Sequence, residues 1–178
     1  MAQITTAIND ETFPLQLRII VKLSIKFGLR PIQFALLRED DLFFDESSEA
    51  WYLNVPRVKG RTAQLRRNPN EFVTRELPTE LAQDILSLIE EQIEWIEYDN
   101  SDELLPRPLF KAKELDSVCL AHSKLVEYSW HRTARSISQM FTKSLPCHLN
   151  LYSKYIKDDD GNPLPLKMNA YRFRYTRD

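Results

Sequence analysis

Segments with helical spacing of apolar residues enclose two short strand-like segments, and this order limits the chain to a mixed α+β fold. In residues 14–27 the apolar side chains recur every three or four positions, as they do on one face of a helix. Residues 79–98 show the same spacing and follow Pro78, which suits the start of a helix. Between them, residues 51–55 and 72–77 are rich in the aromatic and β-branched residues that strands favour. The pattern predicts a mainly helical domain with a small antiparallel sheet.

Glycine and proline mark further boundaries in the first part of the chain. Gly28 is a natural end for the first helix, and Pro31 can begin a second helix that ends at Asp40. Residues 56–71 then separate the two predicted strands as a long hairpin loop rich in basic residues. The apolar stripes of the predicted helices supply the expected core residues: Leu15, Ile19, Leu23, Phe27, Phe34, Leu37, Leu81, Ile85 and Leu88.

The second half of the chain carries weaker signals. Residues 99–108 are acidic and contain proline, so we expect a loop. Residues 122–143 have the composition of another helix, and residues 149–156 suit a short one. Residues 158–163 contain three aspartates, a glycine and a proline, which predict a turn.

These elements predict one partial domain over residues 1–178. Its core-like segments are about 14–98 and about 122–178. We expect Tyr152 and Tyr155 to be packing residues within it.

The composition fits a globular protein without a membrane partner. Of the 178 residues 43% are hydrophobic, which is enough for a core and argues against disorder. No apolar run is long enough to span a bilayer, and the polar N-terminus lacks the pattern of a signal peptide. Two cysteines without tight spacing, Cys119 and Cys147, favour a reducing interior. The sequence therefore predicts a cytoplasmic location.

Charge is distributed unevenly although the net charge is only −2. Acidic residues collect in residues 39–41, 45–49 and 90–103. Basic residues collect in residues 57–67 and near the C-terminus: Arg57, Lys59, Arg61, Arg66, Arg67, Lys167, Arg172, Arg174 and Arg177. A surface with one basic side would suit nucleic-acid phosphates. On charge alone, an ordinary solvated surface is the simpler interpretation.

Two arginines stand in distinctive contexts. Arg30 follows an apolar helix in the sequence Gly28-Leu29-Arg30, and Arg174 lies in Tyr171-Arg172-Phe173-Arg174-Tyr175-Thr176. Together with the order of elements over residues 15–81, these contexts resemble the two arginine boxes of the tyrosine recombinase (phage integrase) catalytic domain. Residues 100–165 add little to the resemblance.

The resemblance implies roles for individual residues. Arg30 and Arg174 would be the two catalytic arginines, and Lys59 would be the lysine of the hairpin. Tyr171 takes the place of a histidine that binds the phosphate in this family. Its hydroxyl would form a hydrogen bond to the phosphate, as the histidine ring does. These four would converge on one concave basic surface. The arginines expected to contact DNA are neighbours of these residues: Arg57, Arg61, Arg66, Arg67 and Arg172.

The implied chemistry is DNA strand cleavage and rejoining through a 3′-phosphotyrosine. Two guanidinium forks would stabilise the charge on the nonbridging oxygens of the transition state, and a lysine would protonate the leaving 5′ oxygen. The reaction requires no metal and no nucleotide cofactor. The implied partners are double-stranded DNA and sister subunits, which form a tetramer on paired sites.

Three departures from the family pattern leave alternatives open. Tyr171 replaces the histidine, Gln33 stands where a glutamate is common, and the nucleophilic tyrosine is expected beyond Asp178. One alternative is therefore a catalytically inactive, recombinase-like DNA-binding protein. Another is a helical protein-interaction domain, which the acidic helix and the negative net charge favour.

A zinc site is an unfavoured alternative. Cys119 with His122, and Cys147 with His148, have spacing near that of zinc ligands only in outline. Adjacent cysteine and histidine residues are awkward ligands for one tetrahedral centre. We therefore predict no metal site.

Overall fold

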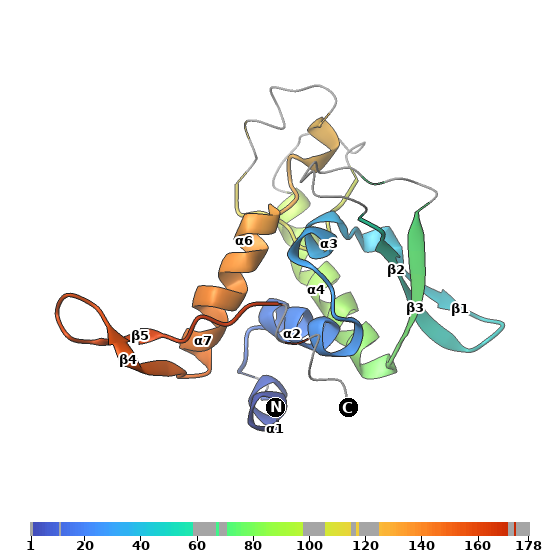
Figure 1. Ribbon diagram of the computed structural model, residues 1–178. Helices are drawn as coiled ribbons and strands as arrows, with labels where there is room; N and C mark the ends of the chain where they lie inside the picture. The colour runs from blue at the N-terminus through green and yellow to red at the C-terminus, as the bar shows by residue number, and fades with distance from the viewer. Residues whose placement is uncertain are drawn as a thin grey trace. The chain divides into compact units, whose positions relative to one another are not determined.

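The computed structural model describes most of the chain and has a mixed α+β architecture. It describes residues 2–10, 12–58, 67, 71–97, 106–114, 117, 125–170 and 173. Helices and a small antiparallel sheet are both present, as the sequence predicts (Figure 1). Within these described ranges, no helix is long and apolar enough to cross a membrane.

The chain divides into two compact units. The first unit combines Met1–Pro31 with Arg135–Asp178, and the second unit is Ile32–Ala134. This division cuts across the two core-like segments drawn from the sequence, because the first helices group with the last quarter of the chain.

The first unit opens with α1 (Ala2–Ile8) and α2 (Leu15–Phe27). Gly28 ends α2 in the left-handed conformation, with φ 62°, and its N–H donates to the Ser24 carbonyl at 2.9 Å. This is the glycine helix stop that the sequence predicts. The buried apolar residues of α2 are Leu17, Ile19, Ile20, Val21 and Leu23. They include the middle of the predicted stripe, Ile19 and Leu23, but not its two ends, Leu15 and Phe27.

A continuous helical run begins the second part of the first unit. It consists of α6 (Ala134–Gln139), a π turn (Met140–Ser144) and α7 (Leu145–His148). The helix predicted over 122–143 therefore starts later than expected. The preceding described residues instead form a short 3₁₀ turn, η2 (Val126–Tyr128), whose buried side chain Tyr128 belongs to the second unit.

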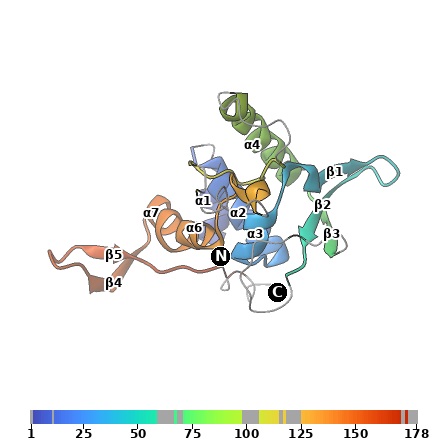
Figure 2. The ribbon, with the colours of Figure 1, turned by 90° about the horizontal axis from the view of Figure 1, so that it is seen from above.

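The predicted short helix over residues 149–156 is wrong. The chain instead forms β4 (Tyr152–Lys157), which pairs antiparallel with β5 (Pro163–Pro165). This ribbon extends away from α6 and α7 in both views (Figures 1 and 2). The aromatic and β-branched residues of β4 favour an extended strand once a tight turn supplies a partner.

The turn between β4 and β5 is held by one aspartate. The Asp158 carboxylate accepts the N–H groups of Asp160 at 3.1 Å and Asn162 at 2.7 Å. The turn prediction for this segment is confirmed, but the packing prediction for the tyrosines of β4 is wrong. Tyr155 is 94% exposed and Tyr152 is 45% exposed, because the ribbon has no covering layer among the described residues.

The second unit contains a three-stranded antiparallel sheet in the order β1-β2-β3 (Figure 1). The strands are β1 (Leu42–Asp45), β2 (Ala50–Pro56) and β3 (Phe72–Leu77). Strands β2 and β3 confirm the prediction, whereas β1 was not predicted. Cross-strand aromatic pairs accompany β1: Phe43 with Tyr52 at 5.7 Å and Phe44 with Trp51 at 5.2 Å between ring centroids.

Two further helices complete the second unit. Helix α4 (Thr79–Glu97) matches the predicted helix, contacts β2, and buries Leu81, Ala82, Ile85 and Leu88. Helix α3 (Pro31–Leu36) starts at the predicted proline but ends before Asp40. Beyond it, Arg38 is extended and its N–H donates to the Asp41 carboxylate at 2.8 Å. Such side-chain bonds compete with continued helix, and a 3₁₀ turn, η1 (Glu39–Asp41), follows.

The chain around residue 109 is anchored to the second unit by backbone and amide bonds. Leu109 donates its N–H to the Leu37 carbonyl at 2.9 Å. The buried Gln92 side chain donates to the Leu109 carbonyl at 3.1 Å and accepts the Lys111 N–H at 2.9 Å. Leu109 and Phe110 are thereby held in the core.

Candidate functional site

Arg30 lies on the short connection between α2 and α3. The left-handed Gly28 ends α2, and Pro31 begins α3 two residues after Leu29. Leu29 is buried, whereas Arg30 is exposed. The first arginine predicted from the sequence is therefore accessible from solvent, next to a buried residue that fixes the connection.

Gln33, the residue that departs from the family pattern, has a defined contact. Its amide nitrogen donates to the carbonyl of Pro56 at 3.0 Å, which links α3 to the end of β2. An ionised glutamate at this position would have only acceptor atoms, so it could not donate a hydrogen bond to that carbonyl. The glutamine therefore suits the local geometry better than the acid common in the family.

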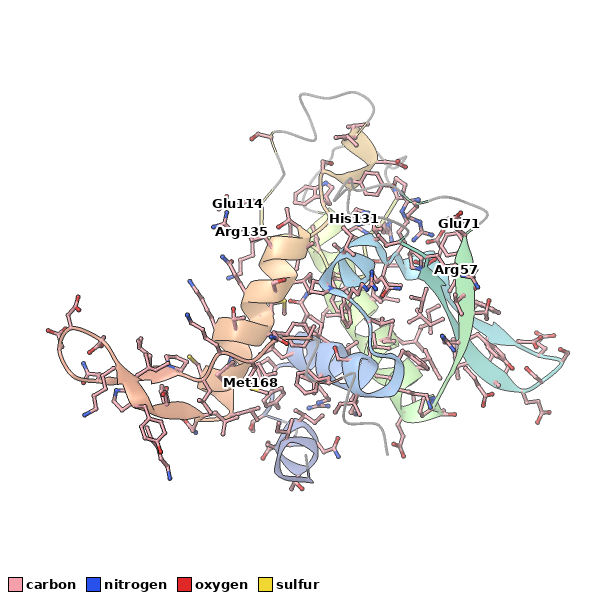
Figure 3. All side chains as sticks on the ribbon, in the orientation of Figure 1. Arg57, Glu71, Glu114, His131, Arg135 and Met168 are labelled. Carbon is pink, nitrogen blue, oxygen red and sulfur yellow. The ribbon has the colours of Figure 1, made fainter. Side chains whose placement is uncertain are left out.

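The basic loop leaves the sheet immediately after this contact. Arg57 is exposed, and its N–H donates to the Glu71 carbonyl at 2.8 Å. Figure 3 labels both residues, where β2 ends and β3 begins. The predicted site residues Lys59, Arg61 and Arg66 lie outside the described residues.

Arg67, at the far end of the basic loop, is among the described residues. Its guanidinium donates hydrogen bonds to acceptors within the second unit. It forms a two-point contact with Asp41, with Nη1 to Oδ2 at 2.6 Å and Nη2 to Oδ1 at 2.8 Å. Nη1 also donates to the Leu36 carbonyl at 2.8 Å, and the Arg67 backbone N–H donates to the Tyr128 hydroxyl at 2.8 Å. We call Arg67, Asp41 and Tyr128 the Arg67 clamp.

The Arg67 clamp is largely shielded from solvent. The side chains of Arg67 and Asp41 are 11% and 3% exposed, and Tyr128 is 2% exposed. Burial raises the pKa of Asp41, and hydrogen bonds from Arg67 oppose that rise. This geometry favours a structural role for Arg67 over the DNA contact predicted from the sequence, because its donors already bind protein acceptors.

His131 lies against Tyr128 of the Arg67 clamp and is buried. Its Nδ1 lies 2.7 Å from the Ala35 carbonyl, so Nδ1 carries the proton. Its ring packs edge-on against Tyr128, with centroids 5.1 Å apart. Burial lowers the pKa of His131 to about 4, so the ring is neutral at pH 7. Nε2 has no hydrogen-bond partner among the residues that the structure describes.

Sequence reasoning missed this buried polar group. Nothing in the run Glu39-Asp40-Asp41 distinguishes the buried Asp41 from the exposed Asp40. The helical pattern of residues 122–143 marks Tyr128 as a candidate core residue, which its burial confirms, but it gives Tyr128 no polar partner and His131 no role. The one signal in the sequence for this buried polar group was Arg67 itself, a charged residue at the end of the long basic loop.

The C-terminal box is described at one residue only. Phe173 is buried in the first unit, and its ring lies 5.8 Å from that of Phe141. The predicted site residues Tyr171, Arg172 and Arg174 lie outside the described residues. Their predicted convergence with Arg30 and Lys59 therefore stays a prediction.

The described part of the chain offers no obvious metal centre. In those ranges, no group of three or more histidine, cysteine, aspartate or glutamate side chains is placed to hold an ion. Cys119 and His122 lie outside the described residues, and Cys147 and His148 are both exposed.

Comparisons with known proteins add no assignment. No model of a protein family matches the sequence. No curated protein matches it at a significant level.

Proposed function

We propose that this chain is part of the catalytic domain of a tyrosine recombinase, which cleaves and rejoins DNA through a 3′-phosphotyrosine. The observation that carries the proposal is the placement of Arg30. It is exposed two residues after the left-handed Gly28 and directly before α3, in the element order that the resemblance implies. That order continues through an acidic turn, antiparallel strands joined by a basic loop, and α4.

The chemistry needs fixed positive charge beside a phosphate. A guanidinium remains charged at all physiological pH values and matches two phosphate oxygens with parallel N–H groups. Arg30 would provide one such fork, and Arg174 the other. Charge stabilisation of this kind is one of the largest contributions to phosphoryl-transfer rates.

The base of the β2–β3 hairpin supports the proposed position of Lys59. The Gln33 amide donates to the Pro56 carbonyl, and the Arg57 backbone N–H donates to the Glu71 carbonyl, so the chain has a defined course up to Arg57. Lys59 would protonate the 5′ oxygen as the DNA strand leaves. Arg57 is exposed at this base and would contact a neighbouring phosphate.

A second candidate is a recombinase-like DNA-binding protein without catalysis. Gln33 favours this second candidate. Where the family commonly has a glutamate, this chain has an amide that donates to the Pro56 carbonyl at the base of the hairpin. The third reading, a helical interaction domain, has less support. Helix α4 directs its apolar residues Leu81, Ile85 and Leu88 into its own unit, so they are not available to a partner.

Covalent trapping tests the proposal. The protein from the complete reading frame is incubated with nicked DNA that carries candidate sites from the source element. We expect a protein–DNA adduct that forms about 100- to 1,000-fold more slowly in Arg30→Ala and Arg174→Ala. Arg75→Ala is the matched control, since Arg75 is an exposed arginine on β3 outside the proposed site.

The possible results distinguish the three candidate functions. An adduct that forms as fast in Arg30→Ala as in the unmodified protein would remove Arg30 from the reaction. Salt-sensitive DNA binding without any adduct would support the second candidate. No DNA binding at all would support the interaction domain.

A further inference from the structure

The β4–β5 ribbon exposes a group of large apolar side chains. On β4, Tyr155 is 94% exposed, Ile156 is 57% exposed and Tyr152 is 45% exposed. On the returning chain, Leu164 and Leu166 are 38% and 42% exposed. The ribbon extends away from α6 and α7 in both views (Figures 1 and 2). Single exposed apolar residues are ordinary on a protein surface, but a contiguous group on one short ribbon marks an interaction site.

A bulge in β4 presents two of these side chains to solvent. Between its two paired positions, β4 contains residues 153–156, whereas β5 contains only residue 164. The Ser153 hydroxyl closes the bulge, because it accepts the N–H groups of Tyr155 at 3.2 Å and Ile156 at 2.9 Å. Bulges redirect side chains and are specific features of a fold. The exposure of Tyr155 and Ile156 therefore follows from a hydrogen-bonded backbone.

The root of the ribbon is attached to the first unit. Leu151 donates its N–H to the Pro146 carbonyl of α7 at 2.8 Å, and Leu166 donates its N–H to the Leu151 carbonyl at 2.9 Å. Asn150 adopts a left-handed φ of 52° where the chain passes from α7 into β4. A ribbon held in this way loses little conformational entropy when a partner binds.

Charge indicates what kind of partner the ribbon fits. Residues 151–168 contain three lysines and three aspartates, all exposed, so the ribbon carries no net charge: Lys154, Lys157, Lys167, Asp158, Asp159 and Asp160. The three aspartates lie together at the tip, while Lys154 and Lys167 lie nearer the root. Such a tip repels DNA phosphates, but an identical ribbon that runs the opposite way places lysines beside it. The ribbon is therefore complementary to a second copy of itself.

We propose that the ribbon is a self-association surface: two copies pack their ribbons antiparallel around a two-fold axis near Ile156, with Lys154 of each copy against Asp159 of the other. Ile156 lies between these two residues in the sequence, so a two-fold axis near it brings each lysine to the opposite aspartate. Tyr155 and Ile156 of both copies cover one another at the centre, as aromatic and aliphatic residues do in the core of an interface. The inference goes beyond the proposed function and does not depend on it.

Sedimentation velocity over a concentration series, at low salt, measures the self-association. We expect the unmodified chain to shift from monomer to dimer as its concentration rises. Lys154→Glu and Asp159→Lys should each weaken the dimer at least about tenfold, because each places like charges together at both symmetric contacts. Lys143→Glu and Asp40→Lys change exposed charges outside the ribbon, so these matched controls should associate like the unmodified chain.

Mixing the two ribbon variants tests the pairing itself. In a dimer of one Lys154→Glu copy and one Asp159→Lys copy, opposite charges meet at both contacts, so the mixture should associate within about threefold of the unmodified chain. A substitution that merely unfolded the chain could not be rescued in this way. Tyr155→Ser should weaken the dimer at least about tenfold, since it removes the most exposed aromatic ring from the centre.

The contrary outcomes are equally specific to the ribbon. A chain that stays monomeric up to its solubility limit would overturn the proposal, as would a mixture that associates no better than its components. A dimer that persists in all three ribbon variants would place the contact elsewhere and overturn it too. DNA binding that weakens in Lys154→Glu, without self-association, would make the ribbon a nucleic-acid surface instead. None of these results requires adduct formation, so failure of the recombinase proposal leaves this inference standing.

Discussion

Arg30 and Arg67 are the same residue type in two opposite environments. Arg30 is exposed beside a buried leucine, whereas Arg67 is enclosed by Asp41, Leu36 and Tyr128. A buried guanidinium must satisfy its donors within the protein, since leaving them unpaired costs several kcal/mol, about 3–5 kcal/mol for a broken buried pair. The role of each arginine is therefore set by its surroundings and not by the local density of positive charge.

His131 should make the stability of the protein depend on pH. Its pKa falls from 6.5 to about 4 in the folded protein, so on acidification the unfolded chain takes up a proton first. The free energy of unfolding should therefore fall as the pH drops from about 6.5 toward 4, by roughly 2–3 kcal/mol from this residue. Urea unfolding of the unmodified chain and of His131→Gln, at pH 7 and pH ~4.5, measures the difference.

His148→Gln supplies a control for the substitution itself, since His148 is exposed and lies in the first unit, away from His131 in the sequence. His131→Gln should lose part of the pH dependence of the unmodified chain. Equal pH dependence in His131→Gln and the unmodified chain would show that another group is responsible.

At the scale of elements, local sequence determined the boundaries at Gly28 and Pro31 but did not decide whether residues 149–156 form a helix or a strand. Gly28 and Pro31 mark real boundaries because each acts as a single residue. Glycine readily adopts the left-handed φ that ends α2, and the ring of proline fixes φ at the start of α3. The segment after α7 formed a strand in place of the expected helix. The turn at Asp158 brings Pro163–Pro165 back alongside it, and only that pairing decides between the two.

Gly28→Ala should destabilise the protein by about 1–2 kcal/mol. The φ of 62° places an alanine Cβ against the following carbonyl, which is the cost of the left-handed region. Gly28→Asn should cost less although the side chain is larger, because asparagine tolerates this conformation. Chemical unfolding of the two variants is the measurement. A larger loss for Asn than for Ala would mean that crowding at this buried position, and not backbone strain, dominates.

At the scale of the whole molecule, the division into two units follows contacts and not chain order. The first unit joins the N-terminal helices to the last quarter of the chain, and each unit has its own buried apolar residues. A net charge of −2 therefore says little about binding, because charge acts through its arrangement on each unit.

If the chain binds DNA as proposed, its affinity for DNA should weaken steeply as the salt concentration rises. If three phosphates are neutralised, affinity should fall roughly 40-fold between about 50 and about 200 mM salt, because bound counterions are released. Fluorescence anisotropy with a labelled duplex gives the slope, and Arg57→Ala should reduce it by about one. Affinity that does not respond to salt would exclude phosphate contacts as the basis of binding.

The sequence by itself determined the α+β class, the helix boundaries at Gly28 and Pro31, strands β2 and β3, and α4. These follow from the spacing of apolar residues and the backbone limits of glycine and proline, which act locally. The same local context marked Arg30 as a candidate; Arg30 is exposed, and its catalytic role stays a prediction.

Only the tertiary structure decided which charges are buried. Asp40 and Asp41 are adjacent acids, yet Asp40 is exposed, whereas Asp41 is buried and forms the contact with Arg67. That choice depends on the Tyr128 hydroxyl and the Leu36 carbonyl, which stand far from Arg67 in the chain. A periodic pattern records which face of an element is apolar, but a buried ion pair requires partners that only the folded chain brings together.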